Sequence, residues 1–122
     1  MTEQVTGQQN EIAKQIFIDA LDTNWMPFGD MAGVSYIALA EPVPEGSIHR
    51  AKLTKGTVIP CHTHPADEFV FVLSGLLETG GRRCEAGTFW KTPANIRQGP
   101  HVAITETEIM TIRLGALGEF EN

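Results

Sequence analysis

Short runs of β-branched and aromatic residues alternate with glycine and proline along most of the chain, and this pattern predicts many short β-strands. The connections between them are too short for crossover helices, so neighbouring strands must run antiparallel and close into a sandwich or barrel. Gly80-Gly81 favours a tight hairpin turn because both glycines accept positive φ. The predicted strands are Ile16–Asp19, Val34–Leu39, Ile48–Thr54, Thr57–His62, Glu68–Leu73, Leu76–Thr79, Arg82–Glu85, Thr88–Lys91, His101–Thr105 and Glu108–Leu114.

The segment from Glu11 to Leu21 permits two interpretations. Ile12, Ile16 and Ala20 fall on one face of a helix, whereas the β-rich run from Ile16 to Ile18 favours a strand. The sequence leaves both alternatives open.

Composition and charge narrow the classes of function. The chain has 122 residues, enough for one domain. Its composition, 42% hydrophobic and 20% charged, excludes a disordered chain. A net charge of −6 repels phosphate and anionic lipid, and the apolar runs are too short to span a bilayer, so we expect no nucleic-acid partner and no membrane association. The polar N-terminus has no secretory signal pattern and two cysteines are too few for a disulfide framework, so the expected compartment is the cytoplasm.

A metal site is predicted where two histidines precede a glutamate. His62 and His64 are two residues apart, so both imidazoles leave one face of an extended chain, and a turn then lets Glu68 open a strand that runs back beside them. Two imidazoles and a carboxylate suit a divalent metal such as Fe, Mn, Ni, Co or Zn. Period-2 alternation places Glu68 on the inner face with Val70 and Val72, where a carboxylate is costly to bury unless a metal compensates its charge. The alternative is a set of unrelated polar residues at a strand end.

The run from Gly56 to Gly75 resembles the first cupin motif: Gly, five residues, His-x-His, three residues, Glu, six residues, Gly. All five fixed positions match at the motif's spacing. These positions are Gly56, His62, His64, Glu68 and Gly75.

The second cupin motif is matched in part. Gly87 and Pro93 fit its opening, but Asn95 stands where a glycine is expected and Thr105 stands at the closing asparagine. His101 comes three residues late, and a longer loop over residues 94–99 accounts for that shift. The resemblance thus implies His101 as a fourth ligand.

Resemblance to small single-domain cupins implies an all-β double-stranded β-helix, or jelly-roll barrel, over residues 34–122, with a short N-terminal extension over residues 1–33 packing on it. It also implies one divalent transition metal per chain, with Fe preferred, held by His62, His64, Glu68 and His101. The first hypothesis is a metal-dependent dioxygenase for a small diketone, hydroxyketone or phenolic substrate, in which Glu68 is both a ligand and a catalytic base. The alternatives are a non-catalytic metal or small-molecule sensor and, less favoured, a sugar isomerase.

The alternation also predicts what lines the pocket and what faces outward. Val58, Val70, Val72, Ala103 and residues of the last predicted strand are expected to line a mostly apolar pocket. The single Tyr36 and both tryptophans, Trp25 and Trp90, are interpreted as core residues, and His49 as a packed or hydrogen-bonded histidine. The large apolar side chains of Phe69, Phe71 and Leu73 point outward, so either the N-terminal segment or a second copy must cover them. We expect a homodimer, the usual assembly of the cupins that this chain resembles.

Overall fold

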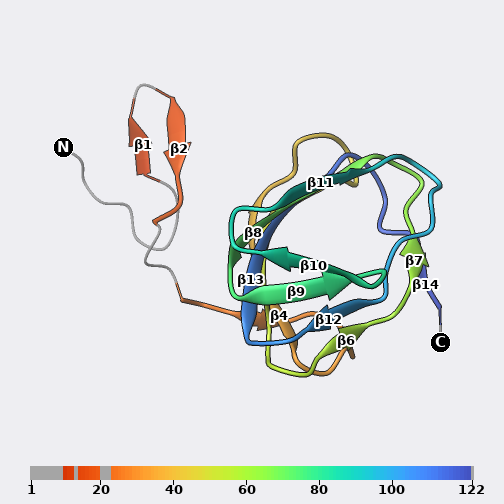
Figure 1. Cartoon of the computed structure of the whole chain (residues 1–122). Coiled ribbons are helices and arrows are strands. Elements are labelled where there is room, and N and C mark those ends of the chain that lie inside the picture. The colour runs from red at the N-terminus through yellow and green to blue at the C-terminus, as the bar shows by residue number, and fades with distance from the viewer. Residues whose placement is uncertain (1–9, 13, 20–22, 122) are drawn as a thin grey trace.

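The computed structural model describes residues 10–12, 14–19 and 23–121, and every regular element within these ranges is a β-strand. Figure 1 shows most strands arranged around a barrel, with the β1–β2 hairpin outside it. The strands are β1 (Asn10–Ile12), β2 (Gln15–Phe17), β3 (Met26–Pro27), β4 (Val34–Ala40), β5 (Ser47–Leu53), β6 (Val58–Ile59), β7 (His62–Thr63), β8 (Glu68–Ser74), β9 (Leu76–Thr79), β10 (Arg82–Glu85), β11 (Phe89–Thr92), β12 (His101–Ala103), β13 (Thr107–Arg113) and β14 (Glu119–Phe120).

Two antiparallel sheets form the walls of the barrel. The larger has six strands in the order β11-β8-β13-β5-β4-β3, and the smaller has four in the order β10-β9-β12-β6. The short pair β14-β7 lies at one end, where the C-terminal segment returns to the middle of the chain (Figure 1). The all-β cupin fold predicted from the sequence is confirmed, and its strand order is that of a jelly roll.

The barrel interior changes from apolar to polar along its length. Leu53, Val72, Leu77 and Ala103 have no exposed surface and fill one part of the interior. Across β8, β13 and β5, paired inward side chains form three rows of increasing polarity. The rows are Val72–Ile109–Ala51, then Val70–Thr111–His49, then Glu68–Arg113–Ser47. The polar row marks the end of the barrel where side chains capable of binding or catalysis lie.

The predicted strand Thr57–His62 is divided in the structure, and this division corrects the expected pocket. β6 ends at Ile59 and β7 begins at His62, because Pro60 has no N–H to continue the pairing. The break also changes which side chains face inward, since Ile59 is buried whereas Val58 is 52% exposed. The prediction that Val58 lines the interior is therefore wrong.

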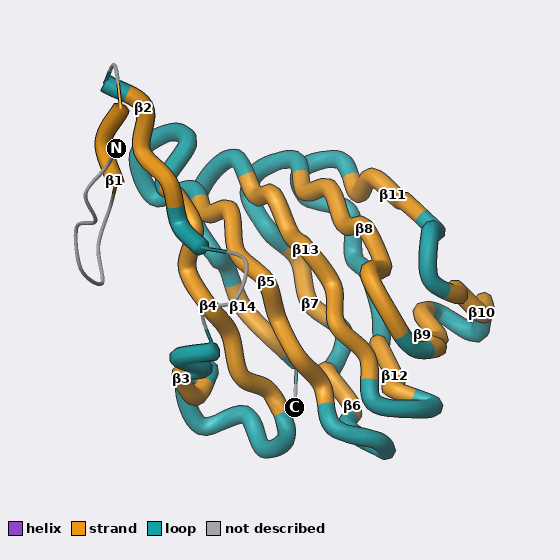
Figure 2. The backbone as a smooth tube through the Cα atoms, turned by 90° about the vertical axis from the view of Figure 1, so that its left-hand side faces the viewer, coloured by secondary structure: helices purple, strands orange, loops and turns teal. Residues whose placement is uncertain are grey.

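The N-terminal region contains strand rather than helix where it is described. Residues 10–12 pair with Gln15–Phe17 as a two-stranded hairpin, so the strand interpretation of this segment is correct; Ala20 and Leu21 lie outside the described residues. Figure 2 shows this hairpin beside the β4 edge of the large sheet, away from β8 and β11. The hairpin therefore leaves the outer faces of those two strands uncovered.

Two tight connections depend on glycine. Gly80 and Gly81 form the predicted hairpin turn between β9 and β10, with φ of 57° and 87°. Gly75, at the β8–β9 junction, has a φ of 86°, and a Cβ atom there would collide with the Glu106 carbonyl oxygen and with Thr107. The last glycine of the first motif is thus required by the close approach of two backbones.

Replacing Gly75 should reveal that close approach as lost stability. We expect Gly75→Ala to lower the free energy of unfolding by about 2–4 kcal/mol, because it adds a collision to an unfavourable φ. Gly87→Ala is the matched control: its φ is 96°, but nothing lies within 4 Å of the added Cβ, so about 1 kcal/mol is expected. Urea unfolding of both variants measures the difference. Equal losses would contradict the collision.

The outer face of the large sheet presents an apolar strip, defined as Phe69, Phe71, Leu73 and Phe89. Phe71, Leu73 and Phe89 are 41%, 37% and 58% exposed, and the rings of Phe69 and Phe89 stack with centroids 6.3 Å apart. The alternation predicted for β8 is confirmed, because Glu68, Val70 and Val72 are buried. A contiguous strip of exposed, large apolar side chains is typical of an interaction surface.

We predict that two copies of the chain pack through this strip as a homodimer. Phe71→Asp should then give a monomer or insoluble protein, because a carboxylate is not tolerated in an apolar interface. Ile96→Asp is the control, since Ile96 is equally apolar and 52% exposed but lies outside the strip. Sedimentation velocity measures the mass. A wild-type protein that stays near 13.3 kDa at tens of micromolar rules out the dimer.

Candidate metal centre

His62, His64 and Glu68 meet at the polar end of the barrel. Their ligand atoms all lie within 4.8 Å of one another, and all three side chains are buried. His62 is positioned by reciprocal backbone hydrogen bonds with Gln98, of 3.0 and 2.9 Å, and Glu68 opens β8 after a turn. The convergence predicted from spacing is confirmed for these three residues.

Backbone carbonyl groups fix how the first two histidines present their rings. His62 Nδ1 lies 2.8 Å from the Pro60 carbonyl oxygen, and His64 Nδ1 contacts the Leu117 carbonyl oxygen. A carbonyl oxygen only accepts hydrogen bonds, so both Nδ1 atoms must carry the proton. In the neutral rings, both Nε2 atoms are then free to offer lone pairs. This is how histidines are held in metal sites.

The His64–Glu68 contact shows that the site needs a cation. His64 Nε2 is buried without a hydrogen-bond partner, although Glu68 Oε2 lies 3.1 Å away. When the ring is neutral, this contact places two acceptors against each other. A proton on Nε2 or a metal ion relieves it. The donor set and the unpartnered nitrogen therefore fit a divalent metal.

The pKa values around this contact are consistent with a shared positive charge. Burial alone would lower the pKa of His64, but the Glu68 carboxylate 3.1 Å away outweighs burial and raises it above its ordinary value. Burial likewise acts to raise the pKa of Glu68, and His64 outweighs it, so that the carboxyl pKa lies below its usual range. A metal ion would replace the proton that His64 otherwise takes up.

The rings of His62 and His101 are neutral at pH 7. Burial, with a smaller effect of the His64 charge, lowers the pKa of His62 despite the hydrogen bond to Pro60, and burial with the His62 charge lowers the pKa of His101 to about 4. Neutral imidazole is the form that binds a metal.

A buried hydrogen-bond chain holds the second oxygen of Glu68. Gln98 Nε2 donates to Glu68 Oε1 at 2.9 Å, and Thr92 Oγ1 donates to Gln98 Oε1 at 3.2 Å. Neither residue was expected from the sequence, because Gln98 falls in the loop over residues 94–99 and Thr92 lies just beyond the predicted strand Thr88–Lys91. No spacing signal identifies them; their roles follow from the pairing of Gln98 with His62.

His101 faces the same cavity from β12 on the smaller sheet. It is buried, its Nδ1 lies 2.8 Å from Thr79 Oγ1, and its ring centroid is 5.1 Å from that of His62. It does not belong to the group of ligand atoms within 4.8 Å. The structure thus brings His101 beside the centre, while its role as a fourth ligand stays a prediction.

The cavity beside the metal centre is small, about 60 Å³, and lined mostly by apolar side chains. Of the expected lining residues, Val70 borders it, while Val72 and Ala103 lie deeper in the core. Trp90 lines the cavity with its ring 5.7 Å from that of His101. His49 is hydrogen-bonded to Ser47 at 2.8 Å, as expected, and also lines the cavity. β13, the last strand predicted from the sequence, completes this wall as expected, with Ile109, Thr111 and Arg113.

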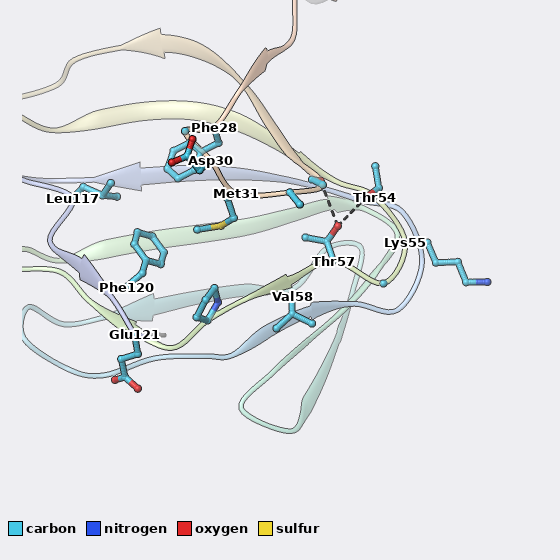
Figure 3. A pocket seen from close by; sticks show the side chains of 15 residues that line it. Phe28, Asp30, Met31, Thr54, Lys55, Thr57, Val58, Leu117, Phe120 and Glu121 are labelled. Carbon is cyan, nitrogen blue, oxygen red and sulfur yellow. Dashed lines mark hydrogen bonds between the residues drawn. The ribbon is translucent and has the colours of Figure 1, made fainter.

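An outer groove of about 760 Å³ adjoins the cavity. Phe28, Met31, Leu117 and Phe120 border both spaces, so they form the boundary between the metal centre and solvent. Figure 3 shows Met31 and Phe120 extending toward each other across this groove, with Thr57 and Val58 at its far side. A ligand reaching the metal centre would pass these four side chains.

The fold and the buried centre define a cupin. The chain belongs to the ChrR cupin-like domain family, which matches residues 13–118. No curated protein matches the chain. No helix in the described part of the chain is long and apolar enough to cross a membrane.

Solved structures share this fold at low sequence identity. An acetylacetone dioxygenase from Acinetobacter johnsonii aligns with a TM-score of 0.72 and 16% identity, covering 94% of this chain and 79% of the other. An RmlC-like cupin from Shewanella frigidimarina aligns at 0.70 with 19% identity, covering 81% and 90%. The Rhodobacter sphaeroides structure of SigE with the anti-sigma ChrR aligns at 0.66 with 21% identity, covering 78% of this chain and 51% of that one. Identities this low show the shared fold alone.

Metal uptake tests the centre directly. We expect about one divalent metal per chain, and His62→Ala or His64→Ala should weaken affinity by more than about a hundredfold, because each removes a ligand. His101→Ala should have a smaller effect. His49→Ala is the control, as its hydrogen bond to Ser47 places it outside the ligand group. Competitive Zn²⁺ titration measures each affinity. If His49→Ala lost metal binding while His101→Ala kept it, His49 rather than His101 would be the fourth ligand.

Proposed function

We propose that this protein is a metal-dependent dioxygenase acting on a small diketone, hydroxyketone or phenolic substrate. The observation that carries the proposal is the buried group of His62, His64 and Glu68, whose ligand atoms lie within 4.8 Å of one another beside a mostly apolar cavity. The fold similarity to an acetylacetone dioxygenase over 94% of the chain supports the same class of reaction by analogy.

In this proposal His62, His64 and Glu68 hold the metal, with His101 as the fourth ligand. A bound redox-active metal, with Fe preferred, supplies Lewis acidity and electron exchange with O₂. The backbone carbonyl groups of Pro60 and Leu117 keep two imidazoles oriented before a substrate arrives.

Glu68 is proposed to act as the base as well as a ligand. Its Oε1 accepts a hydrogen bond from Gln98, and Oε2 faces His64, so Oε2 would share its lone pairs between the metal and the acidic proton of a diketone or a phenol. Trp90 and Phe120 line the cavity and exclude water from that proton transfer. The chain thus supplies orientation, a proton acceptor and a dry pocket.

A second candidate is a metal-dependent sensor without catalytic activity. The family match to the ChrR cupin-like domain supports it, together with the fold similarity to the SigE–ChrR structure. Both candidates use the same metal centre. They differ in whether the bound metal turns over O₂.

Oxygen consumption separates the two candidates. Protein reconstituted with Fe²⁺ and mixed with 2,4-pentanedione, acetoin, catechol or the carboxylated catechol 3,4-dihydroxybenzoate should consume O₂ in proportion to one of these substrates. The Zn²⁺-loaded protein is the matched control, because Zn²⁺ occupies the site without redox chemistry. Repeating the assay with Mn²⁺, Co²⁺ and Ni²⁺ covers the other metals. Full metal occupancy without O₂ uptake for any substrate would reject the dioxygenase and favour the sensor.

A further inference from the structure

Arg113 is a buried arginine beside the metal centre that the proposed chemistry does not use. It ends β13, pairs in register with Glu68 on β8, and is only 8% exposed. Its Nε donates to the Gly115 carbonyl oxygen at 2.8 Å, which fixes the plane of the guanidinium. Among the described residues, Arg113 has no ion pair, and neither terminal nitrogen has a hydrogen-bond partner.

The guanidinium of Arg113 is open to a ligand. Its terminal N–H groups have no acceptor in the described protein, and neither nitrogen is fully buried, so both remain accessible to water or to a binding partner. Arg113 borders a second groove with Tyr36 and Ser47, and it also borders the cavity that His62, His64 and Glu68 line, on the inward row that it shares with Glu68. Two parallel N–H groups match the two oxygens of a carboxylate.

The charge in the cavity favours an anion. Glu68 supplies one negative charge and Arg113 one positive charge on the same wall. A divalent metal held by His62, His64 and Glu68 would add two positive charges and leave an excess that attracts an anion. Burial lowers the pKa of His49 to about 4, with a further contribution from the charge of Arg113. His49 therefore adds no charge at pH 7.

The dimensions restrict the anion to a small head group. The inner cavity of about 60 Å³ accommodates a group of two or three heavy atoms beside Arg113. Phe28, Met31 and Phe120 connect this cavity with the outer groove and offer an apolar path for the remainder of the ligand. Figure 3 shows these three residues where they line the outer groove.

We propose that Arg113 binds the carboxylate of a small organic acid, with the apolar part of the acid directed toward Phe28 and Phe120. This inference rests on the proposed function in taking the cavity as a substrate site, and it adds that the substrate carries a carboxylate. The binding itself requires no turnover, so it can be measured separately from metal uptake and from oxygenase activity.

Propionate and propionamide test the inference, because they have nearly the same shape and differ in charge. NMR titrations at constant ionic strength would use metal-free and Zn²⁺-loaded protein. Wild type should bind propionate at least about tenfold more tightly than propionamide. Arg113→Met should abolish this preference. Arg50→Met is the control, because Arg50 pairs with Glu108 across β5 and β13 and does not border the cavity.

A direct signal covers the case in which Arg113→Met fails to fold. The Nε–H resonance of Arg113 in wild type, identified by its absence from Arg113→Lys, should shift with propionate and not with propionamide. An unchanged resonance, or equal propionate affinity in wild type and Arg113→Met, overturns the inference. Normal Zn²⁺ uptake without the propionate preference rejects this inference alone. Retained preference in a protein that takes up no metal rejects the proposed function and leaves the inference standing.

Discussion

The buried carboxylate of Glu68 requires hydrogen-bond donors and a nearby positive charge, and the residues around it are positioned to supply them. One oxygen accepts a hydrogen bond from Gln98, which Thr92 holds in turn, and the other faces His64. A buried carboxylate with fewer partners would cost several kcal/mol. The reciprocal backbone pairing of Gln98 with His62 brings the Gln98 amide and the His62 imidazole to the same carboxylate.

The barrel interior changes from apolar to polar along its length, so the buried Glu68 carboxylate does not disrupt the apolar core. Val72, Leu77 and Leu53 form a dry core at one part of the interior, whereas the Glu68–Arg113–Ser47 row lies at the other. Stability therefore comes mainly from one region and chemistry from another. The inward rows change over two steps along the same strands, so a one-residue slip in register would move both sets to the wrong face.

Local patterns were sufficient to predict the barrel and the three central residues. The alternation in β8 identified its inward face, and the spacing of His62, His64 and Glu68 brought their side chains to one point. Gln98 and Arg113 could not be predicted in this way, because their positions depend on which distant strands pair and in which register. Val58 was misplaced because Pro60 interrupts the alternation, and a period of two holds only within an unbroken strand.

The contact between His64 and the Leu117 carbonyl group joins residues 53 positions apart. The C-terminal segment also contributes β14, which pairs with β7, and the Glu121 amide that donates to the Cys61 carbonyl oxygen. During synthesis on the ribosome, both histidines and Glu68 are made well before the segment that orients His64. A nascent chain that has not yet extended past residue 117 has ligands but no completed centre. The geometry of the candidate metal centre is thus completed late in the synthesis of this protein.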